Sequence, residues 1–157
     1  SPVITTFEFS PWFGMYRGDR GRLRFGLSYF QVESDEAGHT LSADNVDRLS
    51  RVGAGTGYDS RDSWGDPHQG WLNELQVLKS GWPLPGDADF WTAIVDLRRY
   101  QPIIGRRHTL VLAGLATLQT GEVGRDLPQY MDFHLGGSNS IRGYDVEADR
   151  WQAKTSL

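Results

Sequence analysis

The stretch Asp132-Phe-His-Leu-Gly-Gly-Ser-Asn-Ser-Ile-Arg-Gly-Tyr144 has the composition of a loop with a fixed shape. Gly136 and Gly137 are followed by three small polar residues, a cluster that neither a helix nor a strand interior favours. Arg142 then lies between an isoleucine and a glycine, so its planar guanidinium can lie against a wall while the glycine lets the chain pass close. Such an arginine needs a carboxylate partner. If the tripeptide Arg-Gly-Tyr is considered alone, the alternative to a loop of fixed shape is a solvated turn between two strands.

The longer string, from residue 133 to residue 144, resembles the inward-folded loop of the outer-membrane barrel-assembly and two-partner-secretion transporter superfamily, the Bam/Sam/Toc relatives. That family carries a glycine pair a few residues ahead of a Val/Ile-Arg-Gly-Phe/Tyr tetrad. A second resemblance lies upstream, where Gly57-Tyr-Asp-Ser-Arg-Asp62, followed by Pro67 and Gly70, is similar to a strand end and turn of the same barrels. Two motifs in the family's order make the match fairly specific.

The resemblance implies a transmembrane β-barrel in the outer membrane that inserts barrel proteins or moves polypeptides across that membrane. It implies a lumenal loop at residues 121–146, in which Arg142 bonds an acidic residue on a later strand. The motif residues of this loop are Gly136, Gly137, Ile141, Arg142, Gly143 and Tyr144. The implied partners are outer-membrane lipid, a client polypeptide and periplasmic substrate-handling domains in the full-length chain.

Length and composition set wider bounds. The chain has 157 residues, a net charge of -4 and 23% charged residues, so no basic excess points to DNA or RNA as a partner. It has no cysteine, which excludes disulfides and thiolate metal sites within it. The mean hydropathy of -0.48 resembles that of soluble proteins. However, membrane barrels give the same average because their strands alternate lipid-facing and lumen-facing residues.

Alternation of apolar and polar residues predicts six long strands. They span residues 2–15, 22–32, 49–61, 71–77, 89–101 and 108–120. All of these segments exceed the roughly 5 to 6 residues that are usual in soluble sheets, and the excess favours a membrane span. The last segment is apolar on both faces, so its orientation is not predicted.

The connections between these strands are predicted to alternate in length. We expect tight turns after the first, third and fifth strands and longer loops after the second, fourth and sixth, as in membrane barrels. Residues 33–48 are predicted to be a long exposed loop, with a short helical turn possible at 42–49. This alternation would place the Arg142 loop on the extracellular side.

The fold class that follows is all-β: an antiparallel transmembrane β-barrel segment of about six long strands plus the inward-folded Arg-Gly-Tyr loop. It is partial relative to a roughly sixteen-stranded barrel, since six strands cannot close a membrane barrel. We predict that residues 1–157 are part of one outer-membrane barrel domain. The chain opens at Ser1 without the charged and apolar regions of a secretion signal, so we expect a mature or excised segment.

The polar sides of the predicted strands carry charges of both signs. In a barrel they would line the lumen as a hydrogen-bonded network across neighbouring strands, whereas in a soluble sandwich they would form a wet outer face. The predicted lumenal polar network comprises Asp59, Arg61, Asp62, Glu74, Asp96 and Arg98. Aromatic residues gather near strand ends, which is typical of interfacial girdles.

We predict no catalytic residues, no metal site and no cofactor. The four histidines are scattered without ligand spacing, and no nucleophile elbow or phosphate loop is present. The leading hypothesis is what the resemblance implies: a non-enzymatic outer-membrane barrel for protein insertion or translocation, with an edge strand that templates incoming strands. Two alternatives stay open: the translocator barrel of a patatin-like surface autotransporter, and a soluble carbohydrate-binding β-sandwich with exposed tryptophans.

Overall fold

The structure is a single antiparallel sheet of long strands, seen in a computed structural model that describes residues 3–9, 11–17, 20–35, 38–104 and 107–131. Seven strands and one short helix are assigned within these ranges. They are β1 (Val3–Phe9), β2 (Trp12–Arg17), β3 (Gly21–Ser34), β4 (Val46–Asp59), β5 (Gly70–Ser80), β6 (Phe90–Ile104), β7 (His108–Gln119) and the 3-10 helix η1 (Gln129–Met131).

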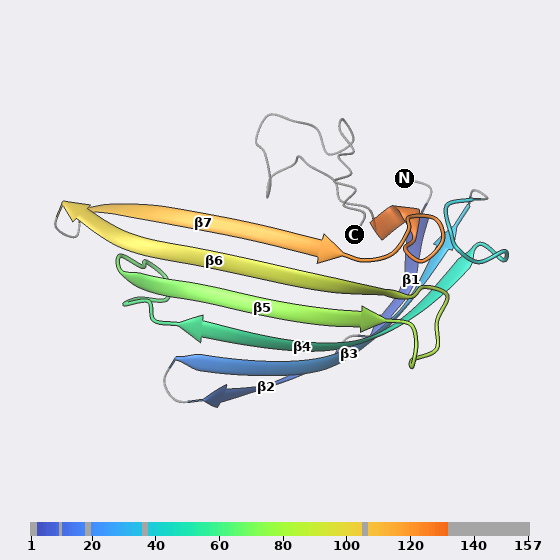
Figure 1. Cartoon of the computed structure of the whole chain (residues 1–157), viewed down its shortest axis with the longest axis horizontal. Coiled ribbons are helices and arrows are strands. Elements are labelled where there is room, and N and C mark those ends of the chain that lie inside the picture. Colours follow the sequence, from blue (N-terminus) through green and yellow to red (C-terminus); the bar gives the residue numbers. More distant parts are fainter. Residues whose placement is uncertain (1–2, 10, 18–19, 36–37, 105–106, 132–157) are drawn as a thin grey trace.

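The strands pair in chain order. β1 and β2 both pair with β3, and β3 to β7 follow as neighbours, so that the stack runs from β2 and β1 at one edge to β7 at the other (Figure 1). Among the described residues β7 does not pair back with β1, so the sheet is open. The all-β, antiparallel, six-strand prediction is thereby confirmed, with β1 and β2 replacing the first predicted strand.

That first strand is interrupted rather than continuous. Pro11 lies at the interruption, where a residue without a backbone N–H cannot donate to a ladder. Its carbonyl still accepts a hydrogen bond from Leu27 N at 3.2 Å. The β1–β3 register also shifts between Thr5 and Phe7. The prediction of one continuous strand with unbroken alternation over residues 2–15 is therefore wrong.

The register separates the side chains into two faces, because residues directly opposite each other on paired strands share a side of the sheet. One row runs Leu23, Thr56, Leu75, Val95 and Ala116 across β3 to β7, and we call this side the apolar face. The adjacent row runs Arg22, Gly57, Glu74, Asp96 and Leu115, and we call its side the polar face. This alternation agrees with the faces predicted from sequence for β3 to β6.

The orientation of β7 is settled only by its pairing. Leu112 lies opposite Arg99 and Leu118 lies opposite Ala93, which places both leucines on the apolar face. Val111 and Leu115 consequently lie on the polar face, although they are also apolar. A strand that is apolar on both sides shows no alternation of apolar and polar residues. Its sequence therefore does not predict which of its residues lie on which face of the sheet.

The predicted alternation of connection lengths holds only in part. The turns after β2 and β6 are short, as expected, but the connection between β4 and β5 (60–69) is as long as the one between β5 and β6 (81–89). The first of these folds back on itself: Ser60 N donates to Trp71 O at 2.8 Å and Asp62 N donates to Gln69 O at 3.0 Å. We call the end of the sheet at which β4 ends and β5 begins the turn end, and the opposite end the loop end.

The region around Asp47 corrects a second expectation. β3 extends to Ser34 and β4 begins at Val46, so the irregular segment is shorter than predicted, and its described residues form turns without a helix. Asp47, placed by sequence in an exposed loop, is fully buried. It is tolerated there because backbone and side-chain donors satisfy its carboxylate.

A compact apolar cluster lies at the loop end. Leu49, Ala88, Phe90 and Leu127 are its buried members, and partly buried side chains pack around them. Residues 120–131 turn back after β7 and supply part of this cluster, with η1 at their end (Figure 1). The rest of the sheet has little buried apolar surface of its own.

Candidate functional site

The middle of the polar face is built around a row of glycines on β4. Gly55 and Gly57 face the same side as Arg22, Arg24 and Glu74, and they lie between β3 and β5. Because glycine has no side chain, the two arginines of β3 can reach over β4 to the glutamate of β5. Arg22 Nη2 lies 2.8 Å from Glu74 Oε1, and Arg24 Nη2 lies 3.6 Å from Glu74 Oε2.

The approach over β4 is close enough to explain why position 57 is a glycine. A Cβ on Gly57 would lie 3.3 Å from Arg22 Nε and 3.6 Å from Glu74 Oε1. A Cβ on Gly55 would lie 3.3 Å from the Leu75 carbonyl oxygen. These glycines therefore leave a gap in the row of side chains on β4, and charged side chains of β3 and β5 meet above it.

Two further ion pairs lie nearer the turn end. Arg98 donates to Asp96 through Nε at 2.9 Å and through Nη2 at 2.7 Å. Arg61 binds Asp59 in the same two-pronged way, at 2.9 and 2.7 Å. Bidentate pairs of this kind fix orientation as well as supply energy. Each pair joins residues two apart in the chain, so each is local to its strand or strand end.

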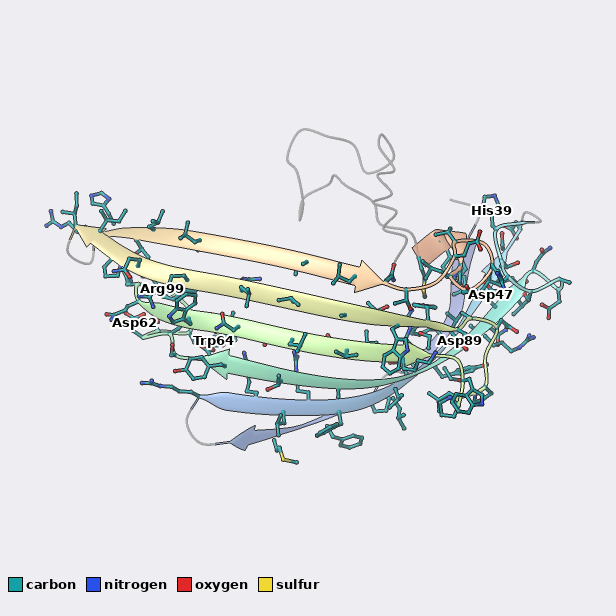
Figure 2. All side chains as sticks on the ribbon, in the orientation of Figure 1. His39, Asp47, Asp62, Trp64, Asp89 and Arg99 are labelled. Atoms are coloured by element: carbon teal, nitrogen blue, oxygen red, sulfur yellow. The ribbon has the colours of Figure 1, made fainter. Side chains whose placement is uncertain are left out.

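Asp62, the remaining member of the predicted polar network, does something different. It lies in the 60–69 connection and accepts hydrogen bonds from the backbone N–H groups of His68 and Gln69, at 2.9 and 3.1 Å. These two donors hold the pKa of the Asp62 carboxyl below its usual value. Its role in the structure is to shape a turn, at the end of the sheet opposite Asp47 (Figure 2).

Sequence reasoning missed the group at the loop end of the polar face. Asp47 and Arg51 lie four residues apart on β4, on the same side, and both contact the segment that follows β7. Tyr130 donates its hydroxyl to Asp47 Oδ2 at 3.1 Å, and Arg51 Nη2 lies 2.8 Å from Met131 Sδ. Extending the alternation of β4 back by three residues would have put Asp47 on this face.

Two cation–aromatic contacts mark the ends of the apolar face. Arg99 lies over the Trp71 ring at 4.8 Å near the turn end, and Lys79 lies over the Trp91 ring at 5.6 Å near the loop end. Lys79 is also ion-paired with Asp89. Figure 2 shows Arg99 and Asp89 at opposite ends of the sheet. Tryptophan, lysine and arginine side chains near the two ends of long strands are typical of the two interfaces between a membrane and water.

The motif residues Gly136, Gly137, Ile141, Arg142, Gly143 and Tyr144 lie outside the described residues, as does residue 132 onward of the predicted lumenal loop. Within the described part of the chain, no group of three or more His, Asp or Glu side chains is arranged to hold a metal ion. In that same part, no helix is long and apolar enough to cross a membrane.

Comparison with known proteins identifies the family. The Omp85 superfamily domain matches residues 1–148. The chain is also 33% identical over 89 residues to the outer membrane protein assembly factor BamA of Nitratidesulfovibrio vulgaris (strain Hildenborough), across 55% of this chain and 11% of that protein. The chain thus spans only a small part of the length of this relative.

Proteins of the matched family reside in outer membranes and are generally assembly or transport barrels rather than enzymes. The match covers both sequence motifs on which the resemblance was based, around Asp59 and around Arg142, and all of the chain before and between them. This chain belongs to the Omp85 superfamily.

Proposed function

We propose that this chain forms part of the wall of an outer-membrane β-barrel that inserts barrel proteins into the outer membrane or moves polypeptides across it. In this proposal the apolar face meets lipid and the polar face lines the lumen. The family membership supports the general role, and the two-sided sheet supports this assignment of the faces.

The observation that carries the proposal is the exposure of the apolar face. Large apolar side chains remain exposed on every strand from β3 to β7, including Phe25 (51%), Leu97 (49%) and Leu118 (66%). Within the described residues no second layer packs on them. An uncovered face of this size is costly in water but is stable against hydrocarbon chains.

Strand length supports the same assignment. β3 and β4 have 14 residues each, β5 has 11 and β6 has 15. A tilted strand needs about 9 to 11 residues to cross a bilayer. The strands are therefore long enough to span the hydrocarbon core and extend beyond it at both ends, where the cation–aromatic contacts lie.

The polar face suits a water-filled interior. The Arg22–Glu74 and Asp96–Arg98 pairs place opposite charges side by side. The face therefore offers no large surface of a single sign that would bind a passing polypeptide strongly. By resemblance, Arg142 would brace a lumenal loop against the wall, and an edge strand would template an incoming strand by backbone pairing. The client polypeptide and any periplasmic substrate-handling domains belong to this proposal.

The two alternatives that the sequence left open differ in how well they agree with this sheet. A soluble sandwich would cover the apolar face with a second sheet, and the described residues form only one sheet. The translocator barrel of a patatin-like autotransporter would use the same wall, so it remains a second form of the same proposal.

The assignment of faces can be tested with cysteines at two neighbouring positions of β5. This chain has no cysteine, so Leu75→Cys and Gln76→Cys can each be spin-labelled in the full-length protein after any other cysteines are replaced. In lipid vesicles, we expect the label at 75 to be quenched by oxygen dissolved in the bilayer. We expect the label at 76 to be quenched by a water-soluble nickel complex.

Gln76 is the matched control, because it is the next residue of the same strand and lies on the opposite face. Equal access of the nickel complex to both positions would overturn the proposal, since both faces would then meet water. If oxygen instead quenched the label at 76 and the nickel complex quenched the label at 75, the polar face would meet lipid and the apolar face would line the lumen.

A further inference from the structure

The segment that follows β7 is bound to the polar face through a row of three side chains on β4. We call residues 120–131 the arm. The arm closes on itself through hydrogen bonds from Asp126 N and Leu127 N to the Glu122 carbonyl oxygen, at 2.9 and 3.1 Å. Leu127 and Pro128 are buried, so the arm is packed against the sheet and not merely near it.

Asp47 is the first of the three. Its fully buried carboxylate accepts hydrogen bonds from Leu41 N and Ser42 N in the connection between β3 and β4, both at 2.9 Å. It also accepts the hydroxyl of Tyr130 at 3.1 Å. One carboxylate therefore joins β4, the preceding connection and the arm. Such a buried charge is stable only while these donors remain in place.

Leu49 is the second of the three and lies two residues further along β4. It is 1% exposed and packs in the cluster that contains Leu127 of the arm and Phe90 of β6. The β5–β6 connection supports it from another side, because Gly86 forms a bridge with Leu49. An apolar contact thus lies between the two polar ones.

Arg51 is the third. Its Nε donates to Ser80 Oγ at 2.9 Å, which orients the guanidinium, and its Nη2 points to Met131 Sδ. The Phe30 and Phe90 rings lie 4.5 and 5.4 Å from its Cζ. The guanidinium therefore contacts Ser80, Phe30 and Phe90 of the sheet and Met131 of the arm.

We propose that Asp47, Leu49 and Arg51 form an anchoring site that positions the arm on the polar face, and that assembly or transport activity depends on this position. The matching residues on the arm are Tyr130, Leu127 and Met131. The inference rests on the proposed function, because it assigns these residues a positioning role within the same lumen. It is independent of Arg142, since the anchor uses residues of the wall and arm only.

Tyr130→Phe is the sharpest variant, because it removes one hydroxyl and leaves Leu41 N and Ser42 N to satisfy Asp47. Combining it with Met131→Leu also removes the sulfur contact with little change in volume. Tyr58→Phe is the matched control: it deletes a tyrosine hydroxyl on the apolar face, at the turn end, far from the arm.

The experiment uses the full-length protein in liposomes, with spin labels at Arg125→Cys on the arm and Leu97→Cys on the wall, both exposed positions. We expect a narrow distance distribution for the parent protein and for Tyr58→Phe. For Tyr130→Phe we expect roughly a tenfold larger population with a displaced arm, because a hydrogen bond to a charged group is lost. The double variant should show more.

The second readout is the rate at which these liposomes fold an added, unfolded barrel protein. The anchoring site predicts that the rate falls with the displaced population and that Tyr58→Phe leaves it unchanged. Unchanged distances in folded Tyr130→Phe and in the double variant would overturn the anchor. A displaced arm with an unchanged folding rate would overturn the positioning role.

The failure of the proposed function has a different signature. In that case the parent protein would fold no client, while the spin-label distances would still report whether the anchor holds the arm. If the double variant does not fold, the single Tyr130→Phe variant decides both questions.

Discussion

Arg22 on β3 and Glu74 on β5 are ion-paired across the intervening strand β4, with Arg22 Nη2 lying 2.8 Å from Glu74 Oε1. The pair passes over Gly57, which has no side chain to obstruct it. Two strands that share no backbone hydrogen bonds are thereby connected through their side chains. This connection links three strands rather than two.

The first prediction concerns the energy of this pair. Both side chains are about a quarter exposed (26% and 27%), so we expect a coupling free energy of about 0.5–1 kcal/mol from a double-mutant cycle of Arg22→Gln and Glu74→Gln. The measurement is the free energy of unfolding of the full-length protein by urea in lipid vesicles. The exposed pair Arg48–Asp44 is the control and should couple less strongly. A coupling energy of zero at 22 and 74 would contradict the finding.

The second prediction concerns the glycine under the pair. Gly57→Val should lower the free energy of unfolding by about 1–3 kcal/mol, because the added methyl groups collide with Arg22 and Glu74. Thr56→Val is the control, since this neighbour lies on the apolar face and gains only apolar surface there. If both variants were equally stable in the same urea titration, close approach would not be the reason for glycine at position 57.

The third prediction follows from the resemblance of the Ile141-Arg142-Gly143-Tyr144 motif to the family's lumenal loop. Arg142→Ala in the full-length protein should slow assembly or secretion several-fold, whereas Arg17→Ala at the turn end should be near neutral. Arg142→Lys should fall between, because lysine keeps the charge but loses the planar fork. Client folding rates in liposomes measure this, and wild-type rates for Arg142→Ala would remove the residue from the mechanism.

The fourth prediction concerns pH. Burial and the adjacent Asp47 carboxylate raise the pKa of Tyr130, because both disfavour a phenolate. The folded pKa lies above the ordinary value of about 10, so the stabilisation is fully present below that pH and is lost as pH rises beyond it. The ultraviolet difference absorbance between the parent protein and Tyr130→Phe should show no phenolate for this residue until well above the pH at which exposed tyrosines ionise. Ionisation at the ordinary pH would contradict the Tyr130–Asp47 contact.

Much of the fold was predictable because the side-chain period of a strand is a local property. The alternation of Leu23, Phe25 and Leu27 with Arg22 and Arg24 predicted both the strand and its two faces, and the structure confirms them. The break near Pro11 was harder to predict, because the apolar residues just before it and just after it, Phe9 and Phe13, lie on the same face of the sheet. The orientation of β7 was beyond prediction, since it is apolar on both sides.

The candidate site was predictable only as a set of residue types. Sequence placed Glu74, Asp96 and Arg98 on one polar face, but alternation does not say which charges meet. Asp47 was missed because an acidic residue in a polar segment reads as an exposed loop, and its burial depends on donors from residues 41, 42 and 130 that are distant or irregular in conformation.

The sequence by itself determined that this protein is a two-faced antiparallel sheet of the outer-membrane barrel type, because residue order alone sets the period of two and the family motifs. Only the tertiary structure decided that Arg22 meets Glu74 over Gly57, and that Asp47 and Arg51 hold the arm. Those contacts depend on the register between strands and on the return of the chain after β7. Register is fixed by the sum of many pairings across the sheet, not by any one stretch of residues.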